Sequence, residues 1–147
     1  MAYCYEELEQ YNEVIKALEN ALQFNPNSSD VYCDLGTAYS LLNQYALAIS
    51  AYETATKLNP ENKIGFWKLG LTYDYLYYIS SNRSYQLKAY EAYKEVVRID
   101  PNDSIGHYSL GLFYVRMGDL KAALEEYEVL KELDGEKARE LYNKIYY

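Results

Sequence analysis

The 147-residue sequence has little of what catalytic or disulfide-rich proteins need: two cysteines, one histidine and three prolines. Two cysteines are too few for a disulfide framework, so we expect a reducing compartment and a cytoplasmic protein. Neither cysteine has a Cys or His partner at ligand spacing, so the sequence predicts no metal site and no cofactor. The single histidine, His107, is expected to be a packing residue. Without a convergent set of titratable groups we do not expect an enzyme.

Basic residues are also scarce, because 14 Lys and Arg stand against 22 Asp and Glu, a formal net charge of −8. Nucleic-acid binding needs an excess of basic residues on at least one face, so nucleic acid is not an expected partner. No stretch approaches the ~18 consecutive apolar residues of a membrane span, and no secretory signal opens the sequence. Half of the residues are apolar, which is enough to build a folded core.

The sequence does contain an internal repeat. Tyrosines, Leu-Gly pairs and Asn-Pro or Asp-Pro pairs each recur at spacings of 34 and 41 residues. The repeated positions are Tyr39, Tyr73 and Tyr114; Gly36, Gly70 and Gly111; and Pro26, Pro60 and Pro101. Independent residue types that share one period and one seven-residue insertion indicate tandem structural units.

Each unit has the pattern of two helices. In residues 29–62, apolar residues recur at helical spacing before and after the polar pair Asn43-Gln44. A break this short makes the two helices antiparallel neighbours, and Pro60 ends the second one. A glycine inside a helix costs about 1 kcal/mol relative to alanine. We therefore expect Gly36, Gly70 and Gly111 to allow close contact with Ala48, Ala89 and Ala123 of the second helices.

The segment Val31–Gly36, followed by Tyr39, Tyr45, Ala48, Tyr52, Ala55 and Pro60, resembles the tetratricopeptide repeat. The resemblance implies an all-α fold, a right-handed α-α superhelix of tandem helix-turn-helix repeats with a C-terminal capping helix. We expect one domain over residues 1–147. Its parts are a truncated unit at about 1–28, units at 29–62, 63–103 (with the insertion) and 104–137, and a capping helix at 138–147.

Two places depart from a regular array. The first unit retains only about two turns of its first helix, Ala2 to Leu8, which we attribute to truncation of a longer array; the alternative is a docked helix with a frayed tip. The insertion adds about one turn to each arm of the third unit and predicts a hairpin that protrudes by roughly 5 Å, with Ser84 as an N-cap. Its tyrosines either hold the longer arms together or form an interaction knob.

In the family that the sequence resembles, the first helix of each unit lines a concave groove. The register of the core positions assigns to this groove a set of residues that is apolar and aromatic at its centre. They are Cys33, Thr37, Leu41, Ile64, Trp67, Lys68, Leu71, Asp74, Tyr75, Ile105, Tyr108, Leu112 and Arg116. We expect the Cys33 thiol to be accessible. The carboxylate clamp of chaperone-binding members is matched only at Lys68, so that specialisation is not predicted.

These residues predict a protein–protein interaction module, or scaffold, that binds an apolar or amphipathic peptide or helix in the groove. Trp67 is the expected anchor, flanked by Leu71, Tyr108 and Leu112, unless Trp67 and Tyr108 only pack within their own chain. The acids Glu6, Asp34 and Asp74 favour a partner with basic residues beside its apolar ones. The alternative is a self-assembling unit, a homo-oligomer formed through helix ends or the groove.

Overall fold

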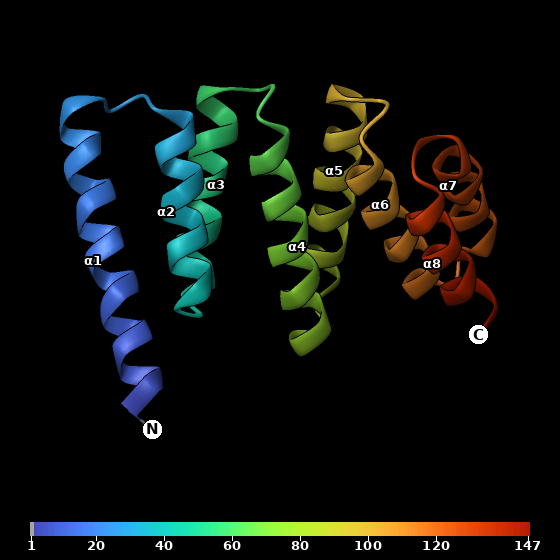
Figure 1. Ribbon diagram of the computed structural model, residues 1–147, viewed down its shortest axis with the longest axis horizontal. Helices are drawn as coiled ribbons and strands as arrows, with labels where there is room; N and C mark the ends of the chain where they lie inside the picture. The colour runs from blue at the N-terminus through green and yellow to red at the C-terminus, as the bar shows by residue number, and fades with distance from the viewer. Residues whose placement is uncertain (1) are drawn as a thin grey trace.

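The computed structural model describes the backbone of residues 2–147 and the side chains from residue 9 onwards. The described residues form eight α-helices and no strand. In chain order these are α1 (Ala2–Phe24), α2 (Ser29–Leu41), α3 (Tyr45–Leu58), α4 (Lys63–Ser80), α5 (Arg83–Ile99), α6 (Ser104–Met117), α7 (Leu120–Leu133) and α8 (Gly135–Tyr146). They follow one another along the long axis of the molecule (Figure 1). No helix in this part of the chain is long and apolar enough to cross a membrane.

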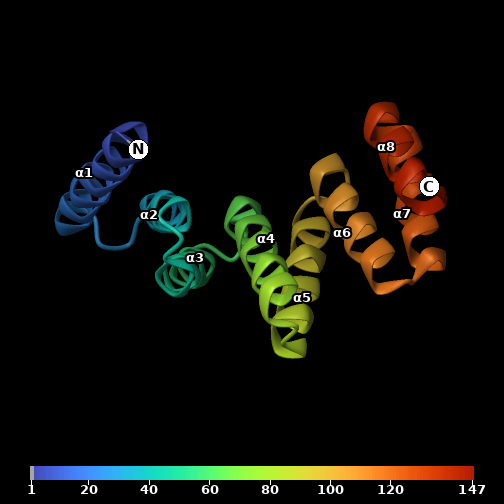
Figure 2. The ribbon, with the colours of Figure 1, turned by 90° about the horizontal axis from the view of Figure 1, so that it is seen from below.

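The helices pack as consecutive pairs, α2 with α3, α4 with α5 and α6 with α7. Figure 2 shows that the chain follows an arc with α1 and α8 at its raised ends and α2, α4 and α6 along the inner side. The first helices approach one another across pairs, since α2 contacts α4 and α6 contacts α8. Among the described residues α3 and α5 have no comparable contact. Helices α2 and α4 therefore approach each other more closely than their partners α3 and α5 do.

The alanines that were expected to contact Gly36, Gly70 and Gly111 are not the residues nearest to them. A Cβ added to Gly36 would lie 2.6 Å from Cε1 of Tyr52, and one added to Gly70 would lie 2.6 Å from Cδ1 of Tyr93. The aromatic rings of the second helices therefore fill the space, rather than the alanines one turn earlier. At Gly111 the space is taken by Leu141 of α8, whose Cδ2 lies 2.5 Å from the added Cβ. The glycines still serve close packing, as expected.

The turns between paired helices explain why the first unit differs. Asn43, Ser81 and Gly118 have φ of 58°, 54° and 74° and end the first helix of their pairs in the left-handed region. Asparagine and glycine tolerate this conformation. The residue 34 positions before Asn43 is Glu9, a good helix former that rarely adopts it. Accordingly α1 continues unbroken through this position, and the expected separate short helix of the first unit is wrong.

The insertion lengthens both helices of the third unit, α4 and α5, as expected. Helix α4 has 18 residues and α5 has 17, against 13 and 14 in α2 and α3. In Figure 1 the lower end of α4 extends beyond the lower end of α2. The expected cap is wrong: Asn82, not Ser84, is the N-cap of α5, and its Oδ1 accepts a hydrogen bond of 3.0 Å from the Ser84 amide. Because the N-cap lies at Asn82, α5 begins at Arg83, two residues earlier than a cap at Ser84 would allow.

The capping helix begins earlier than expected, at Gly135 instead of residue 138. The Asp134 side chain accepts hydrogen bonds from the amides of Glu136 and Lys137 and so caps α8 three residues before its expected start. Ala138 and Leu141 are buried and pack α8 onto the last pair, whereas Tyr142 is 40% exposed. The helix covers the open side of α6 and α7.

A polar joint recurs between consecutive pairs at equivalent positions. Asn62, the N-cap of α4, donates to Oγ of Ser29 at 2.6 Å. One unit later Lys63 takes the place of Ser29, and its Nζ lies 2.5 Å from Asp103, the N-cap of α6, and 2.6 Å from Asp100. Each joint ties the start of one first helix to the start of the next. The inner faces of α2, α4 and α6 are thereby held in register.

Two glycine substitutions test this packing. Replacing Gly70 by alanine drives a methyl group into the Tyr93 ring, so we expect the free energy of unfolding to fall by about 2 kcal/mol. In Gly135→Ala the added Cβ meets nothing within 4 Å, so stability stays constant or rises by up to about 1 kcal/mol. Urea unfolding followed by circular dichroism measures both. Equal stability of the two variants would contradict the glycine–tyrosine contact.

Candidate functional site

A line of apolar side chains runs along the exposed side of α4, on the inner side of the arc. We call it the α4 stripe, and it consists of Ile64, Trp67, Leu71, Tyr75 and Tyr78. Trp67 is partly buried, while the other four side chains are 40 to 82% exposed. Large apolar side chains that are this exposed along one whole helix face indicate an interaction surface. Two hollows flank the stripe.

The α4–α6 hollow, of about 410 Å³, lies beside the start of the stripe. Its lining includes Ile64 and Trp67 of α4 and Ile105 of α6. The Trp67 indole Nε1 donates a hydrogen bond of 3.1 Å to Oγ of Ser109. This bond holds the ring against the adjacent inner helix, as the alternative of packing within the chain expected, and the ring also packs on the core, yet it remains only partly buried. The sequence reasoning missed Ser109, which carries no motif of its own.

The α2–α4 hollow, of about 290 Å³, lies on the opposite side of the stripe, nearer its end. Five expected site residues line it: Thr37, Leu41, Lys68, Leu71 and Tyr75. Tyr45, at the start of α3, also lines it, and its ring centroid lies 5.0 Å from that of Tyr75. This aromatic contact supports the exposed end of α4 from the side. In the sequence Tyr45 is one position of the repeat pattern, which gives no sign of this contact.

Lys68 lines the α2–α4 hollow and follows Trp67 directly in the sequence. Its Nζ is 5.3 Å from the centre of the Trp67 ring, within the range of a cation–π contact. It makes no ion pair within 4.0 Å among the described residues. The centre of the inner face therefore presents one positive charge whose counter-charge is not supplied by the described part of the chain.

Asp74 and Arg116 were expected as separate groove residues, but they form an ion pair with each other across α4 and α6. The Asp74 side chain is only 15% exposed, and burial raises its pKa, although Arg116 and the Tyr93 hydroxyl oppose that rise. The pair therefore joins two inner helices. Asp74 cannot support the expected preference for a basic partner; Asp34 remains exposed, and the Glu6 side chain lies outside the described residues.

Three other expected groove residues lie elsewhere. Cys33 is buried in the core, and burial raises the pKa of its thiol to about 11, so the expectation of an accessible, modifiable thiol is wrong. Tyr108 and Leu112 line neither hollow. They are partly buried against the cluster of Leu130 and Leu141 beneath α8, so they do not flank Trp67 in the way the sequence suggested.

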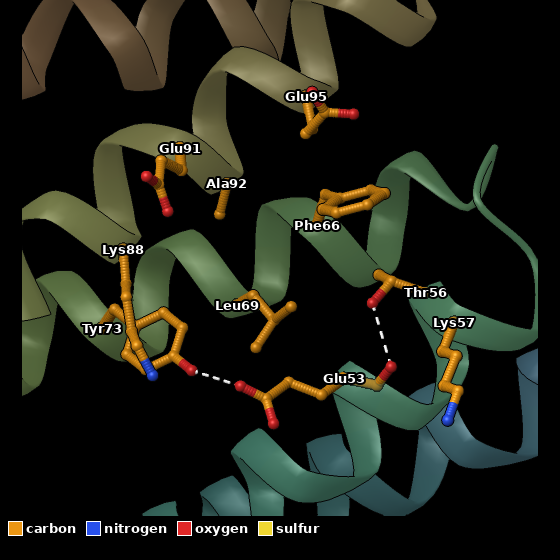
Figure 3. Close-up of a pocket in the computed structure, with 10 residues that line it drawn as sticks. All are labelled: Glu53, Thr56, Lys57, Phe66, Leu69, Tyr73, Lys88, Glu91, Ala92 and Glu95. Atoms are coloured by element: carbon orange, nitrogen blue, oxygen red, sulfur yellow. Dashed lines mark hydrogen bonds between the residues drawn. The ribbon is translucent and has the colours of Figure 1, made fainter.

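A larger hollow of about 480 Å³ lies on the outer side, between α3 and α5 (Figure 3). Its walls are charged, but its own chain already engages several of these groups. The Tyr73 hydroxyl donates to Glu53 at 2.7 Å, Lys88 lies 5.1 Å above the Tyr73 ring, and Glu95 binds Arg98 at 2.8 Å. The Tyr73–Glu53 bond repeats, one unit earlier, as Tyr39 to Glu19 at 3.3 Å. The walls of this outer hollow are therefore held together by side-chain contacts of a kind that recurs from unit to unit.

His107 does more than pack between helices. Its Nδ1 lies 2.6 Å from Glu126 of α7, and its Nε2 lies 2.9 Å from the carbonyl oxygen of Pro101. Both neighbours are acceptors, so both ring nitrogens can be satisfied only when the imidazole is protonated. The hydrogen bond to Glu126 raises the pKa of His107, against the opposing effect of burial. No group of His, Cys, Asp and Glu in the described part of the chain is arranged to hold a metal ion.

The fold and the inner face define a short solenoid of helix pairs with an exposed apolar concave side. Three tetratricopeptide repeat models match residues 1–28, 29–62 and 92–125. Together they cover well over half of the chain, which belongs to the tetratricopeptide repeat family. The third match is out of phase with the helix pairs, since it begins within α5 and ends within α7. Members of this family are generally non-catalytic scaffolds for protein interactions.

Solved structures agree with this assignment. A crystal structure of MamA superposes with a TM-score of 0.75 at 27% identity, over 92% of this chain and 75% of that one. The MamA RS-1 ArsTM double mutant gives 0.71 at 26% identity, over 93% and 73%. TTC0263, a thermophilic TPR protein of Thermus thermophilus, gives 0.75 over 99% and 79%, and its 21% identity supports the fold alone. No curated protein matches the chain.

The His107–Glu126 pair predicts a pH-dependent stability. Because the native pKa lies above that of the unfolded chain, the pair stabilises fully below about pH 6.5 and loses its effect as pH rises through the native pKa. We expect His107→Gln to lower the free energy of unfolding by about 1 kcal/mol near pH 6 and by less near pH 9. Thermal unfolding of both proteins across this range measures the difference. A difference that stays constant or grows with pH would contradict the pair.

Proposed function

We propose that the chain binds an apolar or amphipathic polypeptide segment on its inner face, with Trp67 as the principal anchor. The observation that supports this most strongly is that Trp67 lies at the edge of an open apolar hollow with its indole N–H fixed on Ser109. Tryptophan that is rigid, central and only partly buried is the type of residue that dominates binding energies. The neighbouring Ile64 and Ile105 remain exposed and add apolar area.

An amphipathic helix suits this face better than an extended strand. The face consists of helices whose main-chain groups are already bonded, so it offers no sheet edge to which a strand could add. Its apolar side chains follow the spacing of a helix, and its two hollows lie on either side of one helix axis.

The alternative ligand of this face is a second copy of the same chain, and sedimentation velocity on the chain alone distinguishes it. Self-association that disappears in Trp67→Ala would assign the inner face to self-assembly.

The anchor is tested by substitution. Helical peptides selected from a displayed library on the wild-type chain are labelled, and their dissociation constants are measured by fluorescence anisotropy. We expect Trp67→Ala to cost about 2 kcal/mol of binding, or roughly 30-fold in affinity. Because Trp67 is not fully buried, the helical circular dichroism signal stays nearly unchanged.

The matched control is Leu87→Ala, which removes an apolar side chain of α5 that is 57% exposed and lines neither inner hollow. Its affinity for the same peptides should equal that of the wild type. Peptides that bind Trp67→Ala as tightly as the wild type, or that lose affinity only in Leu87→Ala, would place the binding surface elsewhere.

A further inference from the structure

The α4 stripe forms a seam that follows the heptad pattern of a coiled coil at Ile64, Trp67, Leu71 and Tyr78, whereas the remaining heptad position is Asp74 and the apolar Tyr75 lies one residue after it. Ile64, Leu71 and Tyr78 are seven residues apart, Trp67 lies three residues after Ile64, and Tyr75 lies four after Leu71. At 3.6 residues per turn these five side chains fall within a narrow sector of the helix. From Ile64 to Tyr78 the seam is about 21 Å long, at 1.5 Å per residue. A seam of this kind accepts a second helix with apolar residues at a similar repeat.

The seven-residue insertion supplies the end of this seam. Tyr75 is 34 residues after Leu41, the last residue of α2, so an α4 of ordinary length would end at Tyr75. The extra turn carries Tyr78, which is 82% exposed. Tyr75 is supported by Tyr45, but Tyr78 has no aromatic partner among the described residues. Thus the insertion presents a large side chain to solvent rather than only packing its own arms together.

The charged residues beside the seam indicate which charge a bound helix should carry. Lys68 flanks the middle of the seam and has no ion-pair partner in the described part of the chain, while Asp74 is neutralised by Arg116 on the other flank. A bound helix would desolvate the Lys68 ammonium group. A carboxylate opposite it would compensate for that cost and fix the register.

We infer that the occupant of the inner face is an amphipathic helix about two heptads long, which lies along α4 with an acidic residue opposite Lys68 and reaches Tyr78. The α4–α6 hollow receives a side chain near one end of this helix, and the α2–α4 hollow receives one near the other. The insertion lengthens the apolar seam of α4 by one turn, so the seam favours a longer partner helix. This inference rests on the proposed function, because it specifies the ligand of the same face.

Two labelled probe peptides test it. The long probe is a helical peptide of about 18 residues, with apolar residues at the a and d positions and glutamate at the flanking positions. The short probe lacks one heptad. Binding is measured by fluorescence anisotropy to the full chain and to four variants. These are Trp67→Ala, Tyr78→Ser, Lys68→Glu and the control Leu87→Ser, which changes an exposed side chain of the same hairpin outside the seam.

We expect Tyr78→Ser to weaken the long probe about tenfold and to leave the short probe unchanged, whereas Trp67→Ala weakens both. Lys68→Glu should weaken the glutamate probes and favour versions in which lysine replaces glutamate. Leu87→Ser should change nothing. Tyr78 is so exposed that its replacement leaves the fold intact, which circular dichroism verifies.

Two outcomes separate the inference from the function on which it rests. If Trp67→Ala weakens binding of the long probe and Tyr78→Ser does not, the inner face binds the peptide but the insertion does not extend the binding surface. The inference is then wrong. If neither variant changes the binding, or if neither probe binds the wild type, both the inference and the proposed function are contradicted.

Discussion

The arrangement of this protein depends on the contact between an inner-helix glycine and an aromatic ring of the paired helix. Tyr52 against Gly36 and Tyr93 against Gly70 place large rings where any other residue would carry a side chain. Both rings are almost completely buried. The two helices of a pair are thereby held at a fixed distance and rotation. That rotation decides which side chains of α2 and α4 remain for the inner face.

The curvature follows from the same constraint applied repeatedly. Helix α2 contacts α4, and two side-chain interactions join α4 to α6, and the stack bends toward this inner side. On the outer side this leaves a hollow whose charged walls are engaged by tyrosine–glutamate and lysine–tyrosine contacts. On the inner side it leaves an apolar stripe beside Lys68, which has no ion-pair partner among the side chains from residue 9 onwards. The asymmetry between the two sides supports the inner side as the binding surface.

Much of the fold could be predicted from the sequence because the same helix spacing and helix-ending residues recur in several units. The helix pairs, their ends at the prolines and the longer helices of the third unit were all predictable from spacing. The continuous α1 was not predicted, although a signal existed: Glu9 stands where later units have Asn43 and Gly118, residues that permit a left-handed turn. The identity of the ring over each glycine depends on helix rotation, which residue spacing alone does not specify.

The candidate site was predicted less completely for a related reason. Spacing indicates which residues share a face: Ile64 and Leu71 are exposed, Trp67 is partly buried, and each lines one of the two inner hollows. It cannot show that Asp74 finds Arg116, 42 residues later in the sequence, or that Tyr108 turns toward α8. These pairings arise only when successive units are stacked. The Asp74–Arg116 pair also removes one of the acids that were expected to favour a basic partner.

The central claim is that a partner helix covers Trp67, and the chain's single tryptophan offers a direct test. Its fluorescence and its quenching by acrylamide should be recorded as a tryptophan-free peptide is titrated to saturation, with binding followed independently by anisotropy. The account predicts that the emission shifts to shorter wavelength and that quenching falls as the peptide binds. Saturable binding with unchanged Trp67 emission and unchanged quenching would contradict it.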